Sequence, residues 1–252
     1  MKRTLILLYG VVAYAVFFAT FLYAIGFIGN LFVPVTIDSP PRDPLPIALL
    51  IDLGLLAAFA LQHSIMARPA FKRWWTSLIP EAAERSTYVL FSSLLLIALF
   101  AFWSPIGGII WRVQDSLAVL FIYGAYTAGW VLVLLSTFLI NHFDLFGLRQ
   151  VWMHFRGRPY TQLPFKTPAL YRVVRHPLYV GWLLVFWSTP VMTSAHVLFA
   201  TMTTAYILIA VRFEERDLMT VHREYADYRR RVPMLIPGLQ RRDRAAARLS
   251  QH

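Results

Sequence analysis

The sequence predicts an all-α fold: a polytopic transmembrane helical bundle with four long spans and a C-terminal helical hairpin, which makes five to six spans. Its 252 residues are 58% hydrophobic and 15% charged, whereas an ordinary soluble domain is about 45–50% apolar and about 25% charged. Long apolar runs recur along the chain: three of them are close to the ~20 residues that a spanning helix needs, and the first is well beyond that length. The Lys and Arg residues gather in alternate loops, which is typical of a membrane protein.

The first predicted span is an almost unbroken apolar run over 4–33. The five prolines between 34 and 46 exclude regular helix there, so the next helix is expected to begin near Leu45. The second, third and fourth spans are predicted from the apolar runs 47–66, 86–103 and 117–140.

Two shorter apolar segments, 178–192 and 195–211, end the membrane region, and they are separated by an interruption near Pro190. Each is slightly short for a perpendicular span, so they form either two short helices or a tight helical hairpin. Both arrangements return the chain to the same side of the membrane.

The distribution of positive charge predicts the orientation. The net charge is +11, and all but Arg42 and Arg112 of the 24 Lys and Arg residues lie at the N-terminus, in the loops after spans two and four, or in the C-terminal tail. Because loops rich in Lys and Arg face the cytoplasm, both termini and the two long loops are expected there. The charge therefore reflects topology and does not indicate a nucleic-acid partner.

Three regions are expected along the chain: N-terminal transmembrane helices over 1–140, a catalytic loop with a cofactor-binding motif and the hairpin over 141–237, and a basic cytoplasmic tail over 238–252. The absence of cysteine excludes disulfides, thiolate metal sites and a cysteine nucleophile. The histidines do not form pairs with metal-ligand spacing within one helix, so neither a metal nor haem is predicted.

The first segment with candidate catalytic residues follows the fourth span, where His142, Asp144 and Arg149 lie close together in the sequence. They form either a proton-handling group, in which Asp144 orients His142 as a neutral base, or a helix end capped by Asn141 with Arg149 at the lipid phosphates. Tyr160, later in this loop, is either a phenol that polarises or deprotonates a nucleophile or part of a turn at the headgroups.

The second such segment is Arg175, His176 and Pro177. Proline disfavours helix at the residue before it and suits the first turn of a new helix. The first amide N–H groups of that helix then lack intrahelical partners and can bind a carboxylate. Gly181, one turn later, permits close approach of a ligand or of a neighbouring helix. The segment is therefore either a ligand site or a capped helix start with a packing glycine.

Glu214 and Glu215 directly follow the last apolar segment. Charged groups at the edge of a membrane are costly and usually have a function. The two glutamates either accept hydrogen bonds from a ribose or ammonium group or pair with arginines such as Arg175 to fasten the bundle. His63, near the cytoplasmic end of the second span, is a further candidate for the same cavity.

These segments together resemble one family. The motif at 175–181, the apolar hairpin, the acidic run at 214–218 and the segment 224–233 are similar to the integral membrane methyltransferases. That family includes isoprenylcysteine carboxyl methyltransferase and phospholipid N-methyltransferases, and the resemblance covers roughly residues 168–237.

The remaining motifs resemble one branch of this family, the bacterial methanethiol S-methyltransferases, which make dimethyl sulfide from methanethiol. They lie at 62–64 and 141–147. A group of denitrification-associated membrane proteins has a similar N-terminal half. The resemblance implies a multi-pass enzyme of the bacterial inner membrane with its active site open to the cytoplasm.

The resemblance also implies S-adenosylmethionine as the cofactor. Carried over position by position, the cofactor motif falls on Arg175, His176, Pro177, Tyr179 and Gly181, and Glu214 and Glu215 close the site. Further cofactor contacts are expected, by position alone, at Tyr171, Tyr228 and Arg229. His63 and Arg149 are the expected substrate contacts.

The implied reaction is methyl transfer to the sulfur of a small volatile thiol. Alkyl thiols titrate above neutral pH, so a base or a hydrogen-bond donor must favour the thiolate. His142 or Tyr160, with Asp144 orienting, is the expected catalytic group. The alternatives are a methyltransferase with a lipid or prenylated acceptor and a non-enzymatic transporter or regulatory membrane protein, which would not bind the cofactor.

Overall fold

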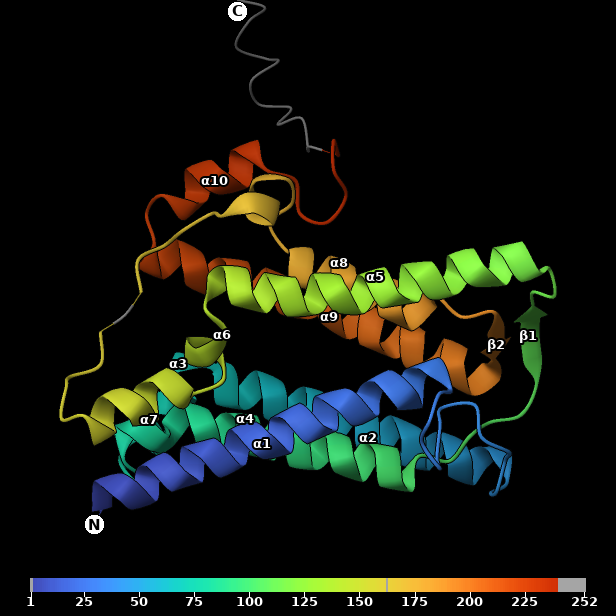
Figure 1. The fold of residues 1–252 in the computed structure, drawn as a ribbon, viewed down its shortest axis with the longest axis horizontal. Helices are drawn as coiled ribbons and strands as arrows, with labels where there is room; N and C mark the ends of the chain where they lie inside the picture. Colours follow the sequence, from blue (N-terminus) through green and yellow to red (C-terminus); the bar gives the residue numbers. More distant parts are fainter. Residues whose placement is uncertain (1, 162, 240–252) are drawn as a thin grey trace, which may run out of the picture.

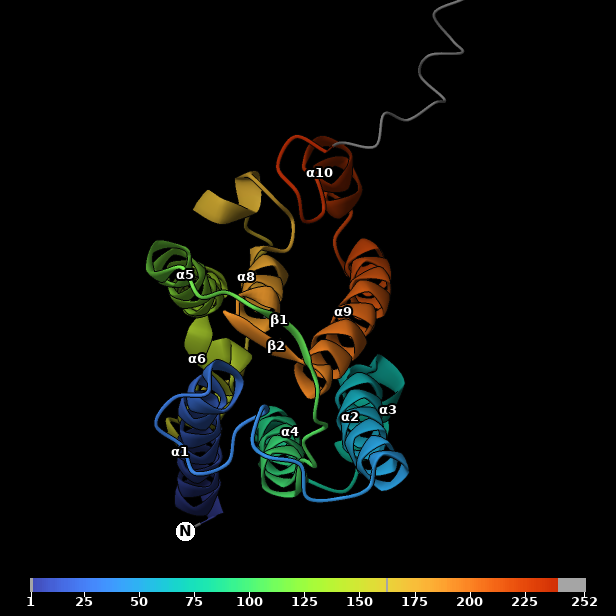
Figure 2. The same cartoon turned by 90° about the vertical axis from the view of Figure 1, so that its right-hand side faces the viewer.

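The computed structural model describes residues 2–161 and 163–239 and has two layers of helices (Figure 1). Within these residues, five helices are long and apolar enough to cross a membrane. They are α1 (Lys2–Gly29), α2 (Leu45–Ala67), α4 (Glu81–Phe102), α5 (Ser116–Ile140) and α9 (Ser194–Val221). The predicted all-α membrane bundle is confirmed. One layer holds α1, α2 and α4, and the other holds α5, α9 and a shorter helix, α8 (Pro177–Trp187) (Figures 1 and 2).

The short elements divide between the two ends of the bundle (Figure 1). At one end lie α3 (Pro69–Trp75), α6 (His142–Leu145), α7 (Leu148–Phe155), the 3₁₀ turn η1 (Ala169–Arg172) and α10 (Tyr225–Arg231). We call it the basic end, because the loops rich in Lys and Arg are there. At the other end, the strand end, β1 (Ile109–Arg112) pairs antiparallel with β2 (Val191–Thr193).

The predicted hairpin is asymmetric. Its first helix, α8, ends at Trp187 and not near 192, because residues 191–193 pair with β1. Its second helix, α9, continues past 211 to Val221. The charged residues that follow the apolar run are good helix formers, so the end of hydrophobicity does not end the helix. Glu214 and Glu215 therefore lie within α9 and not after it.

The contact between α5 and α8 depends on two glycines. A Cβ added to Gly181 would lie 2.8 Å from the carbonyl oxygen of Gly129, and one added to Gly129 would lie 2.9 Å from the carbonyl oxygen of Gly181. Small residues let membrane helices approach this closely. Gly181 is therefore a packing residue, the second of the two roles that its sequence position allows.

Aromatic side chains join the two layers toward the strand end. Phe27 packs on Phe100 with ring centroids 4.7 Å apart, and Trp103 meets Phe199 of the other layer at 5.8 Å. Phe186 of α8 completes the contact, 5.3 Å from Phe199. The two contacts of Phe199 are edge-to-face, and pairs of this kind add stability beyond the area they bury.

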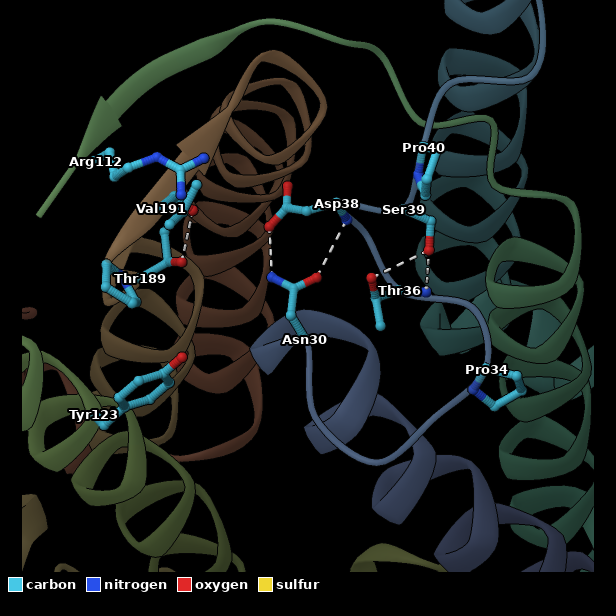
Figure 3. Close-up of a pocket in the computed structure, with 11 residues that line it drawn as sticks. Asn30, Pro34, Thr36, Asp38, Ser39, Pro40, Arg112, Tyr123, Thr189 and Val191 are labelled. Carbon is cyan, nitrogen blue, oxygen red and sulfur yellow. Dashed lines mark hydrogen bonds between the residues drawn. The ribbon is translucent and has the colours of Figure 1, made fainter. Parts of the chain in front are cut away.

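A loop between α1 and α2 closes the strand end. Its Asp38 carboxylate lies 3.1 Å from His196 Nδ1 and accepts hydrogen bonds from Asn30 and Thr193. Asp38 and Arg112 are among the residues that line a cavity of about 450 Å³ here, and Arg112 lies beside Val191 (Figure 3). Asp38 thereby fastens the loop to the start of α9.

Candidate functional site

Three basic side chains converge on one carboxylate at the basic end. Glu215 Oε1 lies 2.6 Å from Arg175 Nε and 3.1 Å from His176 Nε2, and Glu215 Oε2 lies 3.1 Å from Arg229 Nε. The side chains of Glu215 and Arg175 are only 6% and 9% exposed. Taking charges out of water at such a site requires several partners in good geometry. We call this group of four side chains the carboxylate cluster.

The backbone fixes the basic segment of this cluster from both sides. Pro177 begins α8, as predicted, and His176 precedes it with a non-helical conformation. The Arg175 and His176 backbone N–H groups donate to the carbonyl oxygens of Pro233 and Met234, at 2.9 and 3.2 Å. His176 makes no side-chain cap to the helix, so its ring is directed to Glu215 instead.

The neighbouring glutamate of α9 has a different partner. Tyr179 Oη donates to Glu214 Oε2 at 2.9 Å, and the Tyr179 ring lies 5.5 Å from the His176 ring. Glu214 is half-buried, whereas Glu215 is buried. The two adjacent glutamates therefore engage two successive parts of the motif that begins α8.

An aromatic platform of three rings lies next to the carboxylate cluster. Phe165 packs 5.8 Å from Tyr225 and 5.6 Å from Tyr228, and the two tyrosine rings are 5.6 Å apart. Burial raises the pKa of Tyr228 to about 12, and its hydroxyl donates to the carbonyl oxygen of Tyr171. The buried Tyr225 Oη has no hydrogen-bond partner among the residues described. An unmet hydroxyl of this kind costs about 1–3 kcal/mol, and Tyr225 shares this state with six other buried side-chain atoms of the described residues.

The loop after α5 forms a second polar group. Asp144 Oδ1 accepts from Arg149 at 2.9 Å and from Tyr160 Oη at 3.2 Å, and the Arg149 guanidinium lies 5.2 Å over the Tyr160 ring. Burial and the Asp144 charge raise the pKa of Tyr160, so its phenol is a donor and a poor base. The Asn141 side chain caps the start of α6 by accepting from the Asp144 N–H; at the end of α5, where the sequence predicts the cap, only its backbone N–H bonds, to the Thr137 carbonyl oxygen.

His142 is held apart from this group. Its Nδ1 lies 2.9 Å from Thr137 Oγ1, its Nε2 lies 2.8 Å from Tyr14 Oη, and its ring stacks on Phe138 at 4.2 Å. The prediction that Asp144 orients His142 is therefore wrong. The cause is the turn of α6, which directs His142 inward to α1 and Asp144 outward to Arg149. Burial lowers the pKa of His142, so the ring is neutral at neutral pH.

One polar group between the layers was only partly expected. His63 of α2 lies 2.8 Å from Tyr88 Oη and 3.2 Å from Ser92 Oγ, both of α4. Ser64, next in α2, lies 3.2 Å from Tyr206 Oη of α9. The sequence singles out His63 but neither tyrosine. The available signal was the one-turn spacing of Tyr88 and Ser92, which places two polar groups on one face of an apolar helix.

The remaining predicted residues lie around α8. Tyr171, in the turn before this helix, places its hydroxyl 3.4 Å from the carbonyl oxygen of Ser136 in α5.

A second cavity, of about 420 Å³, lies between α1, α3 and α4, away from the carboxylate cluster. Within residues 2–161 and 163–239, no three His, Cys, Asp or Glu side chains gather as a metal ion would require.

Comparison with known proteins finds several methyltransferases. The chain is 59% identical over 238 residues to methanethiol S-methyltransferase of Crocosphaera subtropica, covering 94% of this chain and 93% of that protein. It is 49% identical over 238 residues to the protein of the same name from Mycobacterium tuberculosis, covering 94% and 98%. A more distant relative is nurim of Sus scrofa, 30% identical over 176 residues and 66% of each chain.

Two other comparisons returned nothing. No family profile matches the chain. No solved structure is similar to it.

Proposed function

The chain belongs to the family of the methanethiol S-methyltransferases, and we propose that it transfers a methyl group from S-adenosylmethionine to the sulfur of methanethiol. The product of this transfer is dimethyl sulfide. Identities of 49–59% across nearly the whole chain support the reaction, and the five apolar helices support a multi-pass membrane enzyme.

We further propose that the enzyme lies in the bacterial inner membrane with its basic end in the cytoplasm. The support is the distribution of Lys and Arg, which avoids the strand end except at Arg42 and Arg112. S-adenosylmethionine is made and used in the cytoplasm of cells, so a site at the basic end would have direct access to it.

The residues at the basic end fit S-adenosylmethionine part by part. Arg175 and Arg229 both pair with the Glu215 carboxylate, and Arg229, whose side chain is 44% exposed, can also pair with the carboxylate of the ligand. Glu214 is suited to its ammonium group or ribose hydroxyls, and the half-buried Phe165 ring of the aromatic platform is suited to its purine. The observation that carries this assignment is the convergence of three basic side chains on Glu215 beside the half-buried Glu214, at the basic end of the bundle.

Glu215 has a positioning role in this proposal. Its carboxylate is occupied by Arg175, His176 and Arg229 and is almost fully buried, so it orients these groups and does not itself face the ligand. Pro177 and Gly181 act in the same indirect way, through the start of α8 and its contact with α5.

When bound, S-adenosylmethionine supplies an electrophilic methyl group on a positively charged sulfur. The contribution of the protein is to orient this group and to exclude water, and positioning of reactants can supply about 7–11 kcal/mol. We propose that Asp144, Arg149 and Tyr160 fix the loop after α5 at the edge of the site. His142, neutral and sealed among aromatic rings, fixes the end of α5 against α1.

The test is a calorimetric titration of the purified protein with S-adenosylmethionine. Glu214→Gln keeps the shape of the side chain but removes its charge, and a hydrogen bond to a charged group is worth about 1.5–3 kcal/mol. The variant should therefore bind at least tenfold more weakly, while the exposed Glu224→Gln of the same end should bind as wild type does. Equal affinity in all three proteins would remove Glu214 from the site, and no binding by wild type would end the proposal.

A further inference from the structure

We infer that the thiol is bound and deprotonated at a polar cluster between the two helix layers, with His63 as its proton acceptor. The tyrosine–histidine cluster, as we call it, consists of His63, Ser64, Tyr88, Ser92 and Tyr206. The inference rests on the proposed function, because it names the acceptor side of the same active site.

The cluster brings three helices of both layers together. His63 Nε2 lies 2.8 Å from the hydroxyl of Tyr88, and its Nδ1 lies 3.2 Å from the hydroxyl of Ser92. Tyr206 of α9 reaches α2 through its hydroxyl, 3.2 Å from Ser64, and its ring lies 6.5 Å from the His63 ring. A histidine is thus surrounded by hydroxyl groups inside an otherwise apolar bundle.

The cluster adjoins the proposed cofactor site. Tyr179, which donates to Glu214 at 2.9 Å, lies near enough to Tyr206 and Tyr88 to interact with both electrostatically. On its other side, the Tyr179 ring lies 5.5 Å from the ring of His176 in the carboxylate cluster. Tyr179 therefore stands between the residues assigned to the methyl donor and those assigned here to the thiol.

The surroundings of the cluster suit a small apolar acceptor. His63, Ser64 and Tyr206 are half-buried, so part of each residue lies at the surface of the bundle. Polar groups within a membrane span are costly and mark functional sites. Nearer the end of the bundle, Arg68 pairs with Asp217 at 3.0 Å and joins α2 to α9. Methanethiol is small and apolar, and it can reach the cluster from the bilayer without crossing the charged surface.

The hydroxyl groups supply what a thiolate needs. A thiol bound beside His63 gives its S–H proton to the imidazole, and its sulfur electron pair forms the new bond to the methyl carbon. The bond from that carbon to the donor sulfur breaks, and its electron pair neutralises the sulfonium charge. Tyr88 and Tyr206 can donate hydrogen bonds to the sulfur as negative charge develops, in a site with little water. The proton then leaves His63 for solvent.

His142 is the competing histidine, and its surroundings differ. Its ring is buried against Phe138, Phe143 and Phe146 and faces α1 through Tyr14. His63 instead faces α4 and α9, the helix that carries Glu214. The geometry therefore assigns proton transfer to His63.

The experiment compares His63→Gln with the matched variant His142→Gln, using methanethiol and hydrogen sulfide as acceptors. Loss of a general base lowers turnover by about 10²–10⁴-fold, so His63→Gln should show this loss with methanethiol while its calorimetric affinity for S-adenosylmethionine stays within twofold of wild type. Hydrogen sulfide is smaller and more acidic than an alkyl thiol, so the deficit should shrink with it. His142→Gln should keep most of its activity.

Three outcomes would overturn the inference: full turnover in His63→Gln, an equal deficit with both acceptors, or the large loss in His142→Gln instead. Tyr88→Phe serves as a second variant if His63→Gln does not fold. It should lower turnover with methanethiol without weakening the binding of S-adenosylmethionine. Unchanged turnover would count against a role for the cluster. Calorimetry measures the binding of S-adenosylmethionine to wild type independently of turnover. A wild type that does not bind it would overturn the proposed function itself.

Discussion

Two carboxylate–histidine pairs stand at opposite ends of the hairpin formed by α8 and α9. At the basic end, Glu215 of α9 lies 3.1 Å from His176, the residue before α8. At the strand end, Asp38 of the loop after α1 lies 3.1 Å from His196, in the first turn of α9. The two pairs have the same distance and are almost fully buried, yet only one of them belongs to a candidate active site.

The difference lies in what else each carboxylate binds. Asp38 is completed by the uncharged donors Asn30 and Thr193, and the other ring nitrogen of His196 lies 3.0 Å from the carbonyl oxygen of Phe186. The hydrogen bonds of Asp38 and His196 are all made to groups inside the protein. The pair therefore links the loop after α1 to the hairpin.

The Glu215 pair is not closed in this way. Two arginines share its carboxylate, the side chain of one of them, Arg229, is 44% exposed, and the half-buried Glu214 lies beside them. A buried ion pair is therefore no sign of a binding site by itself. Charged groups that reach the surface, at Arg229 and Glu214, are the feature that separates the two ends.

The largest effect should come from Arg175→Gln, which removes the cation at 2.6 Å from Glu215. Breaking a buried pair from one side costs about 3–5 kcal/mol, because it leaves an uncompensated charge. We expect at least a hundredfold weaker binding of S-adenosylmethionine and a lower melting temperature in detergent. The control is Arg112→Gln, an exposed arginine of the strand end, which should change neither quantity. Normal donor affinity in Arg175→Gln would place the cofactor elsewhere.

Asp38→Asn is the matching variant at the strand end. It weakens the bonds from His196, Thr193 and Asn30, and leaving buried donors unmet costs about 1–3 kcal/mol. The melting temperature should fall, while donor affinity and turnover per folded molecule stay as in wild type. A selective loss of donor affinity without loss of stability would break the comparison, because it would make the strand end part of the site.

Much of the architecture could be predicted from local signals. Unbroken apolar runs predicted the spans, and the proline at 177 predicted the start of α8. The same signals did not predict structure that depends on contacts with distant segments of the chain. The interruption near Pro190 was predicted, but not that 191–193 pairs with β1 or that α9 continues beyond its apolar part.

The candidate site divides in the same way. The motif that contains Arg175 and His176 was visible because charges and a proline are rare in an apolar chain, and one interpretation, that Glu215 pairs with Arg175, is confirmed by the 2.6 Å contact. Tyr88 and Tyr206 were not visible, because each looks like an ordinary aromatic of a membrane helix. Only the packing of α2, α4 and α9 brings them to His63 and gives them a common role.

The smallest expected effect concerns a histidine that lacks any carboxylate. His142 is bound by the neutral groups Thr137 and Tyr14, and burial lowers its pKa, whereas His176 and His196 each have an acidic partner. Its folded-state pKa is below the unfolded value of about 6.5, so the unfolded chain takes up the proton first and stability falls as the pH drops below that value. For one proton the slope is at most about 1.4 kcal/mol per pH unit.

The measurement is the melting temperature of wild type and His142→Gln between neutral pH and about pH 5, a range that spans the unfolded histidine pKa. The variant lacks the titrating ring, so its stability should fall less steeply on acidification, and the two curves should approach each other at low pH. Parallel curves would show that the acid sensitivity arises from the carboxylate–histidine pairs at the two ends and not from the neutral contact at His142.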